Sequence, residues 1–170
     1  MKNAGFKNLE KQLAALIEGD VTLIGIGNPL RGDDAAGSMA ARQIAVGPGV
    51  CVIDAQEVPE DYVQQVVNQP PDTIVLIDSV DLNSAPGSVA LLEPGQIAAY
   101  WPNTHRMPIS MLMAVLEHET HARVFAIGIQ PAQTVFLQPM SDPVTAAVTD
   151  LTAILGRVLA SRVPAHEASA

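Results

Sequence analysis

The sequence predicts an α/β protein, a three-layer α/β/α sandwich whose twisted sheet is mostly parallel and has one antiparallel strand. Short apolar runs typical of buried strands alternate with segments in which apolar residues recur at helical spacing. The run TIVLID at 73–78 is apolar almost throughout, as expected of a strand covered on both faces. The 170 residues, 48% hydrophobic and 16% charged, suit one domain with a substantial core.

The elements follow in order from a helix expected over residues 7–18, where leucine and isoleucine line one face and Gly19 suits the C-terminal cap. This helix makes residues 1–19 an N-terminal extension of a single domain spanning 1–170, and 163–170 are expected to form a flexible tail. Further strands are expected at 21–27, 50–54, 73–78 and 123–130, and further helices at 34–46, 59–68, 105–118 and from 142 onward.

One strand breaks the parallel pattern. The connection SVDLNSAPG after the third strand is too short for a crossover helix, so the strand expected at 87–93 is antiparallel. The last helix is expected to begin with Asp142 as its N-cap and Pro143 as its first helical residue.

The composition limits the classes of partner. A net charge of −9 argues against nucleic acid, which requires clustered basic residues, and it permits a metal ion or a basic protein segment. Neither a signal peptide nor a stretch long enough to span a bilayer is found in the sequence, so no membrane insertion and a cytoplasmic location are expected. The single cysteine, Cys51, lies in an apolar strand and is expected to be a small buried residue.

Carboxylates follow three of the expected strands, at the edge where open α/β sheets form their sites. Asp33 and Asp34 lie in GIGNPLRGDDAAG (25–37), a glycine-rich turn after the first strand, while Asp54 ends the second strand and Asp78 the third. If the strand order begins 2-1-3, Asp34 and Asp78 lie across one crevice. The expected ligand is a cation, because two adjacent carboxylates would repel phosphate.

Each of these residues also has a structural interpretation. Asp33 or Asp34 could cap the following helix, and Asp54 and Asp78 could be turn residues. His105, in NTHRMP at the start of a helix, is on spacing alone more often structural or exposed than a ligand. Two carboxylates with one imidazole nevertheless make a reasonable site for a borderline divalent ion such as nickel or zinc. The other histidines are expected to be solvated: His118, His121 and His166.

Four segments, in order, resemble the nickel–iron hydrogenase maturation proteases, small endopeptidases that trim the C-terminal extension of a hydrogenase large subunit. They are GIGNPLRGDDAAG, LIDSVD at 76–81, THRMP at 104–108, and IGIQP with FLQPMSDPV within 127–144. The last of these resembles the branch that serves formate-hydrogenlyase-type hydrogenases. The likeness extends over residues 20–160 without large gaps.

The resemblance implies that Asp34, Asp78 and His105 contact nickel and are the catalytic residues, with their chemical roles left open. It also implies that the nickel belongs to the substrate, the large-subunit precursor, which the protease tests for nickel before cutting beyond the cysteine motif that holds the metal. Other divalent ions can occupy the same ligands. A monomer is favoured.

The glycine-rich turn can then be interpreted residue by residue. Gly25, Gly27 and Gly32 are expected to let the backbone turn tightly and to leave room for another chain. Asn28 is expected to brace the turn rather than to contact substrate.

Three alternatives stay open. A peptidyl-tRNA hydrolase also opens with a GxGNP stretch and uses histidine and aspartate, but it needs a basic surface. A non-enzymatic nucleotide- or metal-binding module of the doubly wound type is the second, although acids at the helix start would repel pyrophosphate. The third is a related protease of the same fold that acts on another precursor. For the cleavage itself, a metal-polarised carbonyl and a carboxylate-activated water are both consistent with the sequence.

Overall fold

The computed structural model describes the backbone of residues 2–93 and 107–162, and the side chains from residue 7 onward within those ranges. Its sheet has five strands in the order β2-β1-β3-β5-β4. The strands are β1 (Val21–Ile26), β2 (Val50–Gln56), β3 (Thr73–Ser79), β4 (Val89–Leu92) and β5 (Arg123–Ile129). The α-helices are α1 (Lys2–Leu16), α2 (Ala36–Gln43), α3 (Val63–Asn68), α4 (Ile109–Thr120) and α5 (Asp142–Ser161), with 3-10 turns η1 (Gly32–Ala35) and η2 (Pro59–Tyr62).

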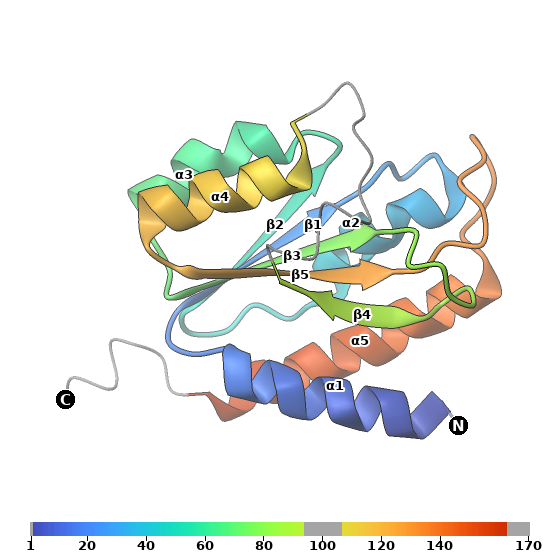
Figure 1. Cartoon of the computed structure of the whole chain (residues 1–170), viewed down its shortest axis with the longest axis horizontal. Coiled ribbons are helices and arrows are strands. Elements are labelled where there is room, and N and C mark those ends of the chain that lie inside the picture. Colours follow the sequence, from blue (N-terminus) through green and yellow to red (C-terminus); the bar gives the residue numbers. More distant parts are fainter. Residues whose placement is uncertain (1, 94–106, 163–170) are drawn as a thin grey trace.

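Helices cover both faces of this sheet, with α3 and α4 on one face and α1, α2 and α5 on the other (Figure 1). Alternation along the central strands supplies both cores: Leu23 and Val75 pack with α1, α2 and α5, while Ile24 and Leu76 pack with α3 and α4. All paired strands run parallel except β4, which is antiparallel to β5. The three-layer α/β/α sandwich and the strand order 2-1-3 are thus confirmed.

The helix α2 packs close against the sheet because Gly25 and Gly37 have no Cβ atom at the contact. A Cβ on Gly37 would meet the carbonyl oxygens of Ile77 and Ile26, and a Cβ on Gly25 would meet the carbonyl oxygen of Gly37. A Cβ on Gly27, which has φ +138, would meet the carbonyl oxygen of Asp34. At Gly25 and Gly27 the space is therefore taken by this chain's own backbone, which corrects the expectation that it accommodates another chain.

The long helix α5 is a core element. By length and composition it is the one helix among the described residues that could cross a membrane. Its apolar face is buried in the core of the fold, however, and this burial explains why the helix is so apolar. The residues of this face are Val144, Val148, Leu151, Leu155 and Val158.

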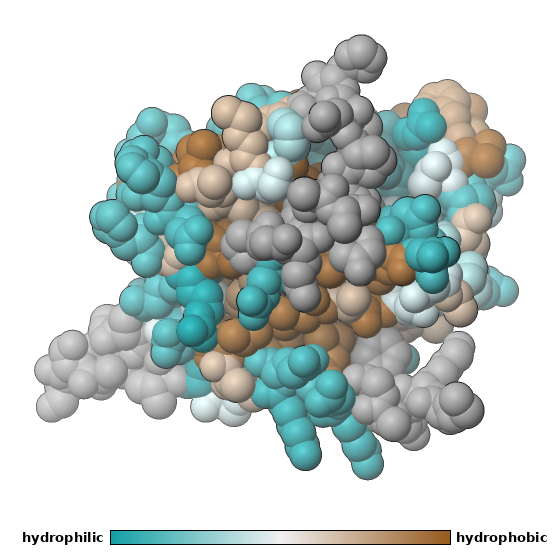
Figure 2. Space-filling model, in the orientation of Figure 1, coloured by the Kyte–Doolittle hydropathy of each residue, from teal (hydrophilic) through white to brown (hydrophobic). Residues whose placement is uncertain are grey.

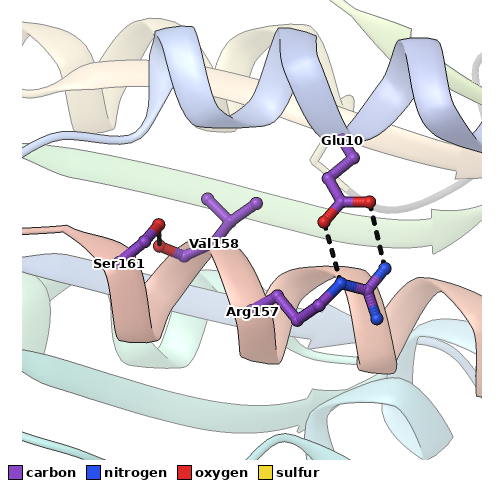
Figure 3. A network of polar contacts seen from close by, with 4 residues as sticks. All are labelled: Glu10, Arg157, Val158 and Ser161. Carbon is purple, nitrogen blue, oxygen red and sulfur yellow. Dashed lines mark hydrogen bonds and ion pairs between the residues drawn. The ribbon is translucent and has the colours of Figure 1, made fainter.

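The first helix packs along α5, as its apolar stripe predicts, with Leu9, Leu13 and Ile17 buried. Beside this contact, Arg157 donates two hydrogen bonds to the Glu10 carboxylate, Nε to Oε1 at 2.8 Å and Nη2 to Oε2 at 3.0 Å (Figure 3). These hydrogen bonds and the positive charge of Arg157 hold the pKa of Glu10 below its ordinary value.

Several element boundaries differ from those expected. The helix α1 begins at Lys2 and ends at Leu16, and the helix expected at 34–46 is a 3-10 turn followed by α2. The helix α4 begins at Ile109 rather than 105, after Pro108 in an extended conformation. It continues through Thr120, so the segment around His118 is helical and not a turn.

Two expectations about single residues have opposite outcomes. Cys51 is exposed, so the expectation that it is buried was wrong. It is the second residue of β2, an edge strand, on the face that Ile53 and Ala55 bury farther along, and edge strands are covered less completely than central ones. His118 and His121 are exposed as expected, whereas His166 and the tail 163–170 lie outside the described residues.

Candidate functional site

The site predicted from the sequence lies where β1 and β3 end. These two parallel strands are neighbours, and their carboxyl ends meet at the right-hand edge of the sheet in Figure 1. The turn after β1 carries Asp34 within η1, and Asp78 is the last residue but one of β3. The chain therefore places these two carboxylates at the ends of adjacent strands, at a switch point of the topology, where α/β sheets form their sites.

His105, the third predicted ligand, lies outside the described residues. Within residues 7–93 and 107–162, no group of three or more histidine, cysteine or acidic side chains is arranged to hold a metal ion. The grouping of Asp34, Asp78 and His105 therefore stays a prediction. Of the three predicted ligands, the structure describes the placement of the two carboxylates, Asp34 and Asp78.

Asp34 is half-buried and closes its own turn. Its Oδ2 accepts a hydrogen bond from the backbone N–H of Asn28 at 3.1 Å. Asn28 in turn accepts the N–H of Leu30 on its side chain at 2.8 Å and that of Arg31 on its carbonyl at 3.1 Å. Asn28 thus braces the turn, as expected. A carboxylate can accept several hydrogen bonds or a cation, so Asp34 retains capacity for a ligand beyond this contact.

Asp78 differs from Asp34 in being almost fully buried, with 8% of its surface exposed. Its Oδ1 accepts the backbone N–H of Ser79 at 2.7 Å, which fixes the side chain at the strand end. It is the sixth residue of β3, whose first six residues are all buried, so the strand holds its backbone in place.

The neighbouring Asp33 has a structural role. It is fully buried, and its Oδ2 accepts hydrogen bonds from the N–H groups of Ala132 at 2.7 Å and Gln133 at 3.1 Å and from the hydroxyl of Ser141 at 2.9 Å. Its Oδ1 accepts the N–H of Ser141 at 2.6 Å. Asp33 therefore clamps the glycine-rich turn to the segment between β5 and α5.

This clamp corrects two expectations about capping. Neither Asp33 nor Asp34 caps the helix that follows, because η1 and α2 have no side-chain cap hydrogen bond. The N-cap residue of α5 is Ser141 rather than Asp142, and its hydroxyl contacts Asp33 instead of the helix. Local pattern could not reveal this, since 108 residues separate the partners.

Asp54 lies away from the site. The strand β2 continues past it to Gln56, and its Oδ2 accepts a hydrogen bond from Arg42 Nε at 2.7 Å. Burial raises the pKa of Asp54, but the nearby Ser38 hydroxyl and the Arg42 guanidinium outweigh it, so the pKa lies below its ordinary value. Because Ser38 Oγ and Asp54 Oδ1 are buried without meeting hydrogen-bond geometry among the described residues, we assign the main stabilising contact to Arg42.

Gln130, a residue for which the sequence predicted no role, organises the chain next to Asp78. This glutamine is 8% exposed, and its Oε1 accepts the N–H groups of Leu82 at 2.6 Å and Ser84 at 3.2 Å. It thereby fixes the start of the connection that leaves β3. A polar residue closing the apolar run RVFAIGIQ was the signal available in the sequence.

The chain is similar to known hydrogenase maturation proteases in sequence and in fold. A family model described as HycI, hydrogenase maturation protease, matches residues 37–157. The hydrogenase 3 maturation protease of Escherichia coli (strain K12) is 32% identical over 129 residues, or 74% of this chain and 82% of the relative. The matched range begins just after Asp34 and contains Asp78 and His105.

Solved structures agree with this match. The solution structure of the endopeptidase HycI from Escherichia coli is 29% identical and has a TM-score of 0.75, covering 81% of this chain and 90% of that one. The crystal structure of a nickel–iron hydrogenase maturation protease HycI from Thermococcus kodakarensis KOD1 is 24% identical, with a TM-score of 0.81 over 88% of this chain and 99% of that one. The latter similarity is one of fold.

Proposed function

Since this chain belongs to the hydrogenase maturation protease family, we propose that it removes the C-terminal extension of a nickel–iron hydrogenase large-subunit precursor after nickel has been inserted. Family membership makes it a peptide hydrolase and sets aside the peptidyl-tRNA hydrolase and the non-enzymatic binding module. The observation that carries the finer proposal is the placement of Asp34 and Asp78 at the ends of adjacent strands, at the edge where such sheets form sites.

We propose that Asp34, Asp78 and His105 contact nickel that the precursor carries. Two carboxylates and one imidazole suit a borderline divalent ion, and three protein ligands leave coordination positions for groups of the precursor. Asp33 and Asn28 hold the turn that presents Asp34, and the end of a central strand presents Asp78, so both carboxylates are positioned in advance.

The cleavage itself is hydrolysis of one peptide bond of the precursor. Water adds to the scissile carbonyl carbon, the C–N bond breaks, and a proton passes to the leaving amine. The site is compatible with two ways of promoting this attack: polarisation of the carbonyl by the precursor's nickel, or activation of the water by a carboxylate.

The wider properties of the chain agree with such a partner. A net charge of −9 favours approach of a cationic centre. The exposed free thiol of Cys51 fits a reducing compartment, and we propose that the protein acts in the cytoplasm as a monomer.

The nickel requirement is the direct test. Purified enzyme, stripped with a chelator, is incubated with nickel-loaded and with nickel-free precursor, and cleavage is followed by the mobility and mass of the large subunit. The stripped enzyme should process the nickel-loaded precursor and leave the nickel-free precursor intact. Cleavage of both at the same rate would contradict the proposed role of substrate nickel, and cleavage of neither would contradict the proposed substrate.

A further inference from the structure

Four exposed apolar side chains gather beside the candidate site. Leu30 in the turn after β1 is 54% exposed, and Val135, Phe136 and Leu137 in the segment after β5 are 56%, 55% and 69% exposed. The backbone N–H of Leu137 donates to the carbonyl of Leu30 at 2.7 Å, which joins the two segments. We call these four residues the apolar rim.

Figure 2 shows brown and tan side chains exposed at the upper right of the molecule, where these two loops meet in Figure 1. The other large apolar side chains that are exposed in the described part of the chain are separated along the sequence: Val46, Val58 and Met111. Single exposed residues of that kind need no explanation, whereas a cluster is typical of an interaction surface.

The backbone conformation of Leu137 indicates that the apolar rim has a function. Its φ is +60°, a left-handed conformation that bulky side chains rarely adopt. With most of its surface exposed, the side chain gains little from burial that would offset the strain. Unfavourable backbone conformations of this kind concentrate at functional sites.

Polar contacts beneath the apolar rim hold it rigid. Gln133 accepts the N–H of Val135 on its Oε1 at 2.7 Å and donates from Nε2 to the carbonyl of Pro139 at 3.0 Å. The N–H of Gln138 donates to the carbonyl of Val135 at 3.3 Å. The segment therefore satisfies its polar groups internally and presents its apolar side chains outward in a fixed arrangement, which lowers the entropy cost of binding a partner.

The apolar rim is continuous with the candidate site. The clamp at Asp33 binds the segment that carries the rim, and the N–H of Gly32 donates to the carbonyl of Gln138 at 3.1 Å. Asp34 directly follows Asp33 in the same turn. A polypeptide whose scissile bond lies at Asp34 and Asp78 must pass beside these loops.

We propose that Leu30, Val135, Phe136 and Leu137 dock an apolar segment of the hydrogenase large-subunit precursor and so position its scissile bond. This inference rests on the proposed function and adds the surface that recognises the substrate. Contact with the rim would supply binding energy away from the reacting atoms, and its loss should therefore raise KM more than it lowers kcat.

The test uses two variants of the rim and one matched control. Phe136→Ser removes an exposed aromatic ring, and Leu137→Asn replaces an exposed leucine by a residue that tolerates the left-handed conformation. Val46→Ser alters an equally exposed residue (70%) before β2, at the opposite edge of the sheet. Binding of nickel-free precursor, which the enzyme is expected to leave intact, is measured by calorimetry, processing of nickel-loaded precursor by KM and kcat, and folding by thermal melting.

We expect the double variant Phe136→Ser/Leu137→Asn to bind the precursor about tenfold more weakly and to raise KM by a similar factor. The melting temperature of Leu137→Asn alone should be unchanged or higher, because the strain is relieved. Val46→Ser should match the wild type throughout. A double variant with the binding and KM of Val46→Ser would overturn the docking inference while leaving the proposed function intact. A wild-type enzyme that neither binds nor cuts the precursor would overturn both.

Discussion

Two adjacent aspartates with different tasks define the site at the scale of single residues. Asp33 is directed into the protein and accepts from three backbone N–H groups and one hydroxyl, whereas Asp34 accepts from one N–H group and is half-buried. The adjacent pair in the sequence did not by itself show which aspartate is structural and which retains capacity for a ligand. The distinction arises from the segment after β5, which returns to the turn from more than ninety residues away in the sequence.

Substitution by alanine should separate these roles. Asp33→Ala removes the fully buried carboxylate that four donors share, and we expect it to lower the free energy of unfolding by roughly 3 kcal/mol. Asp34→Ala removes one contact of a half-buried group and should cost about 1 kcal/mol. Urea unfolding of both variants measures the difference. Equal losses would mean that Asp33 does not clamp the turn.

Asp78 carries the corresponding prediction for the reaction. Asp78→Asn keeps the volume and an oxygen that can accept the Ser79 N–H, but it removes one negative charge. We expect processing of the precursor to be lost while the melting temperature changes little. Asp54→Asn is the matched control, since that carboxylate lies on β2, which β1 separates from β3, and it pairs with Arg42. Normal processing by Asp78→Asn would make Asp78 a turn residue only.

At the scale of elements, the sequence predicted the strands and helices better than it predicted their boundaries. Apolar runs and helical spacing identified the strands and helices, because burial determines both patterns. Boundaries were missed where non-local contacts set them: Ser141 at the start of α5 bonds to Asp33, and η1 precedes α2 because Gly32 and Asp33 bond to the segment after β5. The carboxylates Asp34 and Asp78 could be predicted from their places at the ends of strands, whereas the role of Gln130 depends on a contact with a distant loop.

The packing of α2 yields a prediction about glycine. Gly37→Ala would place a Cβ against the carbonyl oxygens of Ile77 and Ile26, so we expect a loss of about 2 kcal/mol and displacement of α2 from the sheet. Gly156→Ala in α5 is the control, because the space there is open and alanine favours a helix by about 0.5–1 kcal/mol. Chemical denaturation should therefore give changes of opposite sign. A neutral Gly37→Ala would show that α2 can shift without cost.

At the scale of the whole molecule, the loops that build the site and the attachment of α1 are different parts of the fold. The loops after β1, β3 and β5 meet at the carboxyl edge of the sheet, and the contacts of Asp33 and Gln130 join them there. The helix α1 packs instead along α5, on one face of the sheet (Figure 1). Changes in the attachment of α1 should thus alter stability without altering the geometry around Asp34 and Asp78.

The pH dependence of stability tests that attachment. The hydrogen bonds and charge of Arg157 lower the pKa of Glu10 in the folded protein below its ordinary value of 4.5, so the ion pair stabilises the fold above that pH. The contribution should disappear as the pH falls through the lowered pKa, when Glu10 becomes protonated. It should also weaken with added salt, because both side chains are partly exposed.

A double-mutant cycle with Glu10→Gln and Arg157→Gln isolates this pair. We expect a small favourable coupling energy at pH 7 that is smaller at pH 3, measured by urea unfolding at low ionic strength. Leu13→Ala removes a fully buried side chain between α1 and α5 and should destabilise by about 3 kcal/mol at both pH values, because apolar packing does not titrate. A coupling energy that does not decrease at all as the pH is lowered from 7 would contradict the assignment of the pKa shift to Arg157. If Leu13→Ala were harmless at pH 7, the ion pair rather than the apolar stripe would be what holds α1 in place.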